Sequence, residues 1–165
     1  MAFCAVCGAT HAGETRDLRL GLPQPIFRLD DEERRQRARV EDDFAVLHGP
    51  KGDRHFVRAV LELPIPEEDG RFGYASWIEV SPADVAALGE LWDDEDGWRR
   101  GPFSGTLANE LSPYFATEGL SVRLRLQDVS QLPLVELVDG EHELVRAQRI
   151  GISSHRAHEL AATVD

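Results

Sequence analysis

The sequence has few of the residues that characterise several large classes of protein. Its 165 residues contain two cysteines, Cys4 and Cys7, and one lysine, Lys51. Two cysteines exclude a disulfide-rich secreted scaffold, which a chain of this length does not need in order to fold. No run approaches the roughly 18 consecutive apolar residues of a membrane helix. Residues 1–6 also lack the basic and apolar pattern of a signal peptide, so we expect a cytoplasmic protein without membrane attachment.

Positive charge is scarce as well. The chain has 18 Lys and Arg against 30 Asp and Glu, which gives a formal net charge of −12. Binding to nucleic acid requires clustered cations that replace the counterions of the phosphates. The densest basic run, residues 34–39, directly follows the acidic run 30–33, which cancels its field. We therefore predict no nucleic-acid partner, whereas a basic protein partner is compatible with this charge.

Several motifs of well-known enzymes are missing. The chain contains no G-x-S-x-G nucleophile elbow, no phosphate-binding Gly-Lys-Ser/Thr loop and no H-E-x-x-H zinc motif. The acidic runs at 67–69 and 93–96 lack the ligand spacing of an EF-hand. The sequence therefore predicts no catalytic residue and favours a domain that is not an enzyme.

Alternation of apolar and polar residues is clear in several stretches and is typical of half-buried strands. We predict strands at 44–48, 55–65, 72–80, 121–127 and 134–138, whereas 103–111 is ambiguous and 14–29 is irregular. In 55–65 one face carries Val57, Ala59, Leu61 and Leu63. Helices are predicted at 30–40, after the capping pair Ser81-Pro82, at 141–150 and at 153–164. This order predicts an α+β fold with a mostly antiparallel sheet and with inserted and C-terminal helices, all in one domain over 1–165 with its body at 30–165.

The helix at 30–40 carries few apolar residues and is expected on the surface. Acidic residues precede basic ones by four positions in three pairs, each worth a few tenths of a kcal/mol on a helix. These pairs are Asp30–Arg34, Asp31–Arg35 and Glu33–Arg37.

Both cysteines lie in one C-x-x-C-G motif at residues 4–8. Two thiolates at this spacing bind a single metal ion, and the glycine permits the tight turn that directs backbone N–H groups toward the sulfurs. His11 lies four residues after Cys7, close enough to be a third ligand. The sequence therefore predicts a small zinc knuckle over residues 1–13, with Cys4, Cys7 and His11 as ligands.

A structural zinc ion takes four ligands, so at least one more is needed. The fourth position would be taken by another histidine or by water, and the candidate histidines are His48, His55, His142, His155 and His158. The last two form an H-x-x-H pair that a helix would place on one face. With the two cysteines they would make a Cys2His2 site, provided that the fold brings the two ends of the chain together.

Two other interpretations of the cysteines stay open. A redox C-x-x-C motif follows a strand and begins a helix, and only three residues precede Cys4. The cysteines can also be two ordinary thiols that bind no metal. A structural disulfide is not expected in the cytosol.

Three stretches of the sequence together resemble one bacterial protein family. They are the C-x-x-C-G start with His11, the stretch FSGTLANEL at 103–111, and the pattern E-H-x-L-x-x-x-Q-R-x-G-I at 141–152. In this combination the chain resembles domain-of-unknown-function family number 2199 over nearly its whole length. The resemblance implies a small, single-domain bacterial protein and implies no activity and no catalytic residues. The resemblance supports Cys4, Cys7, His11 and His142 as positions of interest.

Three functional hypotheses follow, of which we favour the first. In the first, the chain is a non-enzymatic domain that binds a protein partner, and zinc orders an N-terminal segment that has little apolar surface of its own. In the second, it is a metal-dependent hydrolase with a water molecule on an open zinc position. In the third, it is an acidic immunity or inhibitor-like protein that binds a basic partner.

Overall fold

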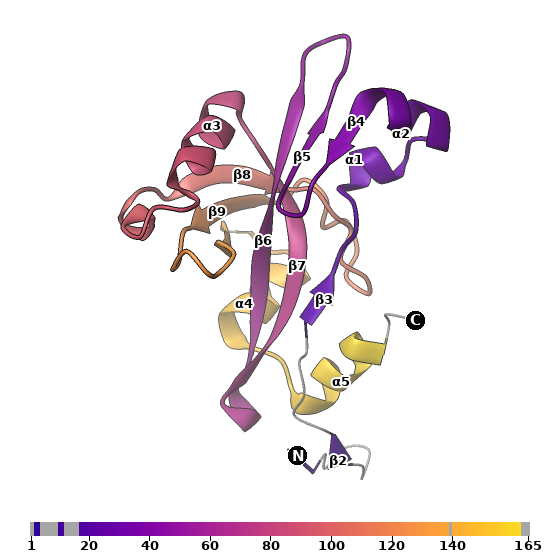
Figure 1. The fold of residues 1–165 in the computed structure, drawn as a ribbon. Coiled ribbons are helices and arrows are strands. Elements are labelled where there is room, and N and C mark those ends of the chain that lie inside the picture. The colour runs from indigo at the N-terminus through magenta and orange to yellow at the C-terminus, as the bar shows by residue number, and fades with distance from the viewer. Residues whose placement is uncertain (1, 4–9, 12–16, 139, 163–165) are drawn as a thin grey trace.

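The computed structural model describes residues 2–3, 10–11, 17–138 and 140–162, and only the backbone of residues 2–3 and 10–11. The strands are β1 (Ala2–Phe3), β2 (Thr10–His11), β3 (Asp17–Arg19), β4 (Ala38–Val40), β5 (Phe44–Leu47), β6 (Arg54–Ile65), β7 (Gly70–Val80), β8 (Phe103–Leu107), β9 (Ser121–Arg125) and β10 (Leu134–Leu137). The α-helices are α1 (Gln24–Phe27), α2 (Asp31–Arg37), α3 (Pro82–Leu91), α4 (Glu143–Ile150) and α5 (Ser154–Ala162), and short 3-10 helices span Pro66–Glu68 and Gly97–Arg99. Figure 1 shows β6 and β7 at the centre, with the helices around them.

Strands β6 and β7 form a long antiparallel hairpin, paired from His55↔Val80 to Ile65↔Gly70. Both strands are longer than their other neighbours, so each changes partner along its second edge. On that edge β6 pairs first with β5 and then with β10, whereas β7 pairs first with β3 and then with β8. Because β8 pairs with β9 and β9 with β10, strands β6 to β10 form a closed five-stranded barrel.

The structure confirms the predicted α+β class, but the sheet is mixed. Strand β10 runs parallel to β6, and β3 runs parallel to β7. The first of these pairs follows from parity, because strand direction cannot alternate at every step around a closed ring of five strands. At least one neighbouring pair must be parallel. Alternating apolar residues identify a strand, but they do not encode its partner or its direction.

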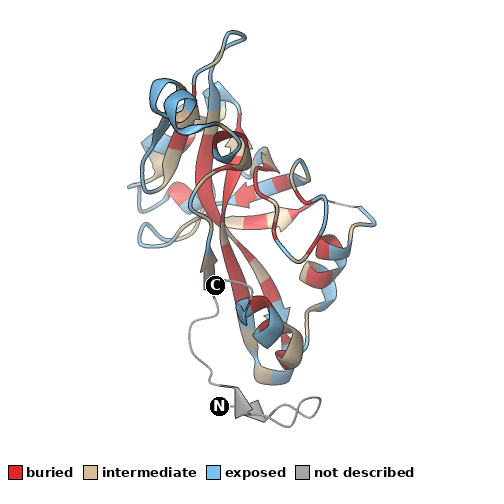
Figure 2. Ribbon diagram, turned by 90° about the vertical axis from the view of Figure 1, so that its right-hand side faces the viewer, coloured by how far each residue is buried: buried red, intermediate tan, exposed pale blue. Residues whose placement is uncertain are grey.

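Two apolar clusters lie on the two faces of the β6–β7 hairpin. The larger cluster draws on all five barrel strands and includes Val57, Ala59, Leu61 and Leu63, which are fully buried on one face of β6 as the alternation predicted. The smaller cluster surrounds Trp77 on the opposite face and includes Phe56 and Ile26. Figure 2 shows the buried residues concentrated along these central strands. The half of β6 that pairs with β5 is therefore covered on both faces.

Helix α2 begins where the sequence predicts and ends earlier. The side chain of Asp30 caps it by accepting a hydrogen bond from the backbone N–H three residues on, at 2.8 Å. The helix ends at Arg37, and residues 38–40 form the edge strand β4 in place of the predicted last helical turn. The stretch 14–29, expected to be irregular, contains β3 and α1. Both differences involve elements of three or four residues, which are too short to show a period.

The ion pairs on α2 also differ from the prediction. Asp31 pairs with Arg34, and Glu32 pairs with Arg35, both at a spacing of three residues instead of four. The Arg34 guanidinium also donates to the backbone carbonyls of residues 26, 27 and 29. This tertiary contact with α1 orients the side chain and overrides the local preference.

The other predicted helices are confirmed. Ser81 caps α3 by accepting a hydrogen bond from the N–H of Asp84 at 3.1 Å, and Pro82 occupies the first turn. Helices α4 and α5 are separated at Gly151. None of the helices in the described part of the chain has the length and apolar character that a bilayer span requires.

Candidate functional site

Within residues 1–13, the predicted zinc knuckle, the structure describes one antiparallel pair of short strands. Strands β1 and β2 pair with Ala2 opposite His11 and Phe3 opposite Thr10. Cys4 and Cys7 lie outside the described residues, and only the backbone of His11 is described. The ligand set Cys4, Cys7 and His11 therefore stays a prediction.

The five histidines considered as a further ligand lie in three places. His48 and His55 lie in the β5–β6 hairpin, His142 precedes α4, and His155 and His158 lie on α5. The α5 pair is three residues apart on a helix, as predicted, so both residues share a face. Among the described residues, no three His, Cys, Asp or Glu side chains are arranged to hold a metal ion.

A groove of about 360 Å³ lies between the β5–β6 hairpin, β4 and α3. Its lining includes the apolar residues Phe44, Val46 and Val85. Among its polar lining residues, Nδ1 of His48 lies 2.8 Å from a carboxylate oxygen of Asp53. A carboxylate on one ring nitrogen orients an imidazole and directs the other nitrogen away from it, as in many metal ligands and general bases. Both side chains are about half exposed, so solvent weakens this pair.

His142 connects α4 to the loop that contains Phe115. Its Nδ1 accepts a hydrogen bond from the N–H of Leu144 at 3.0 Å, which caps the helix. Its Nε2 lies 2.6 Å from the carbonyl oxygen of Phe115, and a carbonyl only accepts, so Nε2 carries the proton. Both ring nitrogens are therefore engaged within the fold, and His142 can bind a metal only if it gives up one of these contacts.

Replacement of His142 tests its role as the helix cap. We expect His142→Ala to lower the free energy of unfolding by about 1–2 kcal/mol, because the helix loses its cap. His142→Asn should recover most of that loss, because asparagine is a good N-cap residue. Urea denaturation of the three proteins provides the measurement. Equal stability of His142→Ala and the unmodified protein would contradict the assignment.

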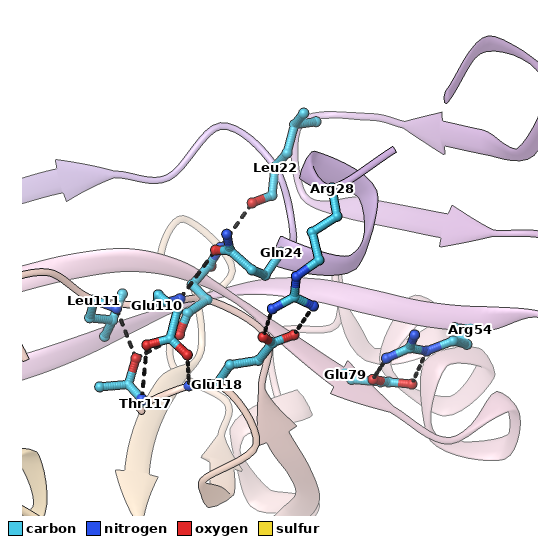
Figure 3. A network of polar contacts seen from close by, with 10 residues as sticks. Leu22, Gln24, Arg28, Arg54, Glu79, Glu110, Leu111, Thr117 and Glu118 are labelled. Carbon is cyan, nitrogen blue, oxygen red and sulfur yellow. Dashed lines mark hydrogen bonds and ion pairs between the residues drawn. The ribbon is translucent and has the colours of Figure 1, made fainter. Parts of the chain in front are cut away.

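The stretch at 103–111, part of the family resemblance, holds several elements together (Figure 3). Asn109 is 1% exposed. Its Oδ1 accepts from the N–H of Trp77 at 2.7 Å, and its Nδ2 donates to the carbonyl of Leu22 at 2.8 Å. One side chain thus joins β7 to the segment that precedes α1.

Glu110 holds the end of the loop that follows. Its two carboxylate oxygens accept from the N–H groups of Thr117 and Glu118, at 3.1 and 3.2 Å (Figure 3). The Thr117 hydroxyl donates to the carbonyl of Asn109 and accepts from the N–H of Leu111, both at 2.8 Å. These contacts satisfy backbone groups, so they give Glu110 and Thr117 a structural role.

Gln148 in the C-terminal motif extends the short parallel pairing of β10 with β6, which spans only residues 134–135 of β10. Its Nε2 donates to the carbonyl of Val135, and its Oε1 accepts from the N–H of Leu137, both at 2.8 Å. A side-chain amide offers the same donor and acceptor as a peptide group. Gln148 therefore takes the place of a neighbouring strand along the end of β10.

A groove of about 470 Å³ lies beside this junction. Four of the charged side chains that line it form two ion pairs, Glu62 with Arg71 at 2.6 Å and Arg125 with Glu136 at 2.9 Å, and Asp69 lines it as well. Opposite charges at these distances cancel most of each other's field, so the groove offers little net attraction to a charged ligand.

Arg58 is a buried cation on the face of β6 opposite Val57 and Ala59. It is 3% exposed, and its guanidinium lies 4.3 Å from the ring centre of Trp77. It donates to the carbonyls of Leu20 and Asp42, both at 2.8 Å. Burial lowers the pKa of the guanidinium from its ordinary value. The sequence feature that indicates this burial is the apolar run on both sides of Arg58, which is typical of a strand covered on two faces.

The sequence motifs thus build the fold at the positions that the structure describes. Asn109 and Glu110 tie a loop to the sheet, and Gln148 extends the barrel edge. The fold and these contacts define an α+β protein with a closed five-stranded barrel.

The chain belongs to the family described as "Uncharacterized protein conserved in bacteria (DUF2199)", whose model matches residues 3–152. This match confirms the resemblance seen in the sequence. No curated protein and no solved structure matches the chain.

Proposed function

We propose that this chain is a cytoplasmic protein-interaction domain whose N-terminal segment is ordered by one zinc ion. The observation that carries the proposal is the C-x-x-C-G motif followed by His11, which puts two thiols and an imidazole within eight residues. The pairing of Phe3 with Thr10 supports it, because the segment that contains both cysteines starts and ends at neighbouring residues. Reduced cytosolic thiols are available as metal ligands.

The arrangement of the helices favours one source for the fourth ligand. Figure 1 shows α5 at the same end of the molecule as β2, whereas the tip of the β5–β6 hairpin lies at the opposite end. This supports His155 or His158 over His48 or His55. The family match ends at residue 152, so this fourth ligand would be a feature of the present chain outside the matched region.

The charge of the molecule supports a basic partner. A net charge of −12 attracts oppositely charged proteins over long range and raises the rate of encounter. Zinc would serve this role by fixing the N-terminal segment in one conformation before binding, which reduces the entropy lost on association.

Metal analysis of protein purified without chelator or metal-affinity resin tests the zinc site. We expect about one zinc per chain, because three or four N and S ligands suffice for tight binding. Cys4→Ala should lose the metal and melt at a lower temperature.

Two further sets of variants complete the test. His55→Ala should keep its zinc and serve as the matched control, whereas loss of zinc in His155→Ala or His158→Ala would identify the fourth ligand. A metal-free wild-type protein with both thiols freely reactive would refute the site.

A further inference from the structure

Phe115 is the most exposed large apolar residue in the described part of the chain. Its exposed fraction is 85%, compared with 61% for Phe27 and 52% for Trp98. A free loop that carries an aromatic residue usually turns it toward the protein, because burial of a phenylalanine side chain is favourable. Phe115 is instead exposed on a loop whose backbone is held by hydrogen bonds.

The backbone on both sides of Phe115 is fixed by hydrogen bonds. The N–H of Tyr114 donates to the carbonyl of Leu111 at 2.9 Å, and His142 donates to the carbonyl of Phe115 itself at 2.6 Å. Two residues later, the Glu110 carboxylate accepts from consecutive backbone N–H groups. The loop is therefore ordered before any partner arrives.

Further contacts extend this order. Arg28 forms a two-point ion pair with Glu118, which joins the loop to the end of α1 (Figure 3). Ala116, directly after Phe115, adopts a left-handed conformation with φ of 54°. Non-glycine residues in this region are strained, and such strain persists where the surroundings impose it and often marks binding sites.

The surface around Phe115 is acidic. Glu110 and Glu118 lie on either side of Phe115 along the chain, and Glu141 and Glu143 flank His142, whose ring contacts the carbonyl of Phe115. Of the guanidinium groups nearby, that of Arg28 is paired with Glu118 and that of Arg156 lies 5.4 Å from the ring centre of Tyr114. The carboxylates are in excess, as they are over the whole chain.

We propose that Phe115 is the anchor of a protein-binding surface and inserts into an apolar pocket on a partner whose pocket has a basic rim. Aromatic anchors that are already ordered bind at low entropic cost and dominate the energy of many interfaces. The surrounding carboxylates select a basic partner and disfavour a second copy of this acidic chain. The proposal rests on the interaction role proposed above, but it is independent of zinc.

Site-specific photo-crosslinking in the native bacterium tests this surface. A photoreactive benzoylphenylalanine replaces Phe115 in the full chain, and matched variants carry it at Phe27 or Trp98, which are also exposed aromatic positions. We expect one prominent adduct from position 115, identified by mass spectrometry as a protein with more Lys and Arg than Asp and Glu, and none from the two control positions.

Binding of the purified partner provides the second measurement. Phe115→Ala should weaken the affinity about 30-fold or more, as expected for a dominant anchor, whereas Phe27→Ala should leave it unchanged. An acidic partner, equal affinity of Phe115→Ala and wild type, or an adduct only at Trp98 would overturn the assigned surface.

The same experiment separates this proposal from the previous one. The absence of adducts from all three positions would count against the interaction role itself and against Phe115 with it. Retention of the adduct at position 115 in a Cys4→Ala background would support the surface whether or not zinc is bound.

Discussion

Gly151→Ala should destabilise the protein by about 2–4 kcal/mol. Gly151 ends α4 with φ of 88° and ψ of 175°, a conformation that is essentially restricted to glycine. A Cβ atom here would lie 2.8 Å from the carbonyl oxygen of Pro64 and 2.8 Å from Cδ of Pro66. Two costs therefore add: backbone strain and a clash with β6 and the turn that follows it.

The carbonyl of Pro64 also fixes the position of the chain after α4. The N–H of Ile152 donates to the carbonyl of Pro64 at 2.8 Å, so any shift that relieves the clash also breaks this bond. The midpoint of urea denaturation gives the measurement. A change below about 0.5 kcal/mol, the range of ordinary surface substitutions, would show that the close approach is not required.

Gly89→Ala is the matched control. Gly89 lies in α3 on the exposed side, and a Cβ atom there meets nothing within 4 Å. Alanine is the better helix former, so this variant should gain about 0.5–1 kcal/mol. Opposite signs for one chemical change at two positions would separate the local geometry from the general effect of adding a methyl group.

Asn109→Ala should cost about 2–4 kcal/mol. The substitution leaves the N–H of Trp77 and the carbonyl of Leu22 without their partner in a region closed to solvent. Buried polar groups without partners cost more than the hydrogen bonds contribute when they are formed. Gln131→Ala, at an exposed amide, is the control and should change stability by less than about 0.5 kcal/mol.

Asn109→Asp adds a test with a defined dependence on pH. Its carboxylate could still accept from Trp77, but it would face the carbonyl of Leu22, which needs a donor. Burial raises the pKa of a carboxyl group and favours its protonated form in the folded protein. The deficit relative to wild type should therefore shrink as the pH falls from 7 toward 4. A deficit that grows over this range would contradict the assigned hydrogen bonds.

Local patterns in the sequence were sufficient for many of the elements. The alternation in 55–65 predicted strand β6 and its buried face, because a strand with one face in the core repeats every two residues. Ser81-Pro82 predicted the start of α3, because a cap acts on the next few backbone N–H groups. The three stretches that resemble the bacterial family were also sufficient to identify it.

Other features depend on contacts between distant residues. Arg58 appears polar in its own strand and is buried only because a second cluster forms around Trp77. The pattern that contains Gln148 can be recognised in the sequence. The role of Gln148 in binding the edge of β10 is visible only in the structure, where the pairing of β10 with β6 ends.

The sequence by itself determined the α+β class, the main strands and helices and the bacterial family, since these depend on short-range periodicity, capping and recognisable motifs. The tertiary structure decided the closure of the barrel, its parallel pair, the burial of Arg58 and the fixed loop that exposes Phe115. The bond from Asn109 to Leu22 joins residues 87 positions apart. Such a partner is selected by the three-dimensional arrangement of the whole chain, which no window of neighbouring residues contains.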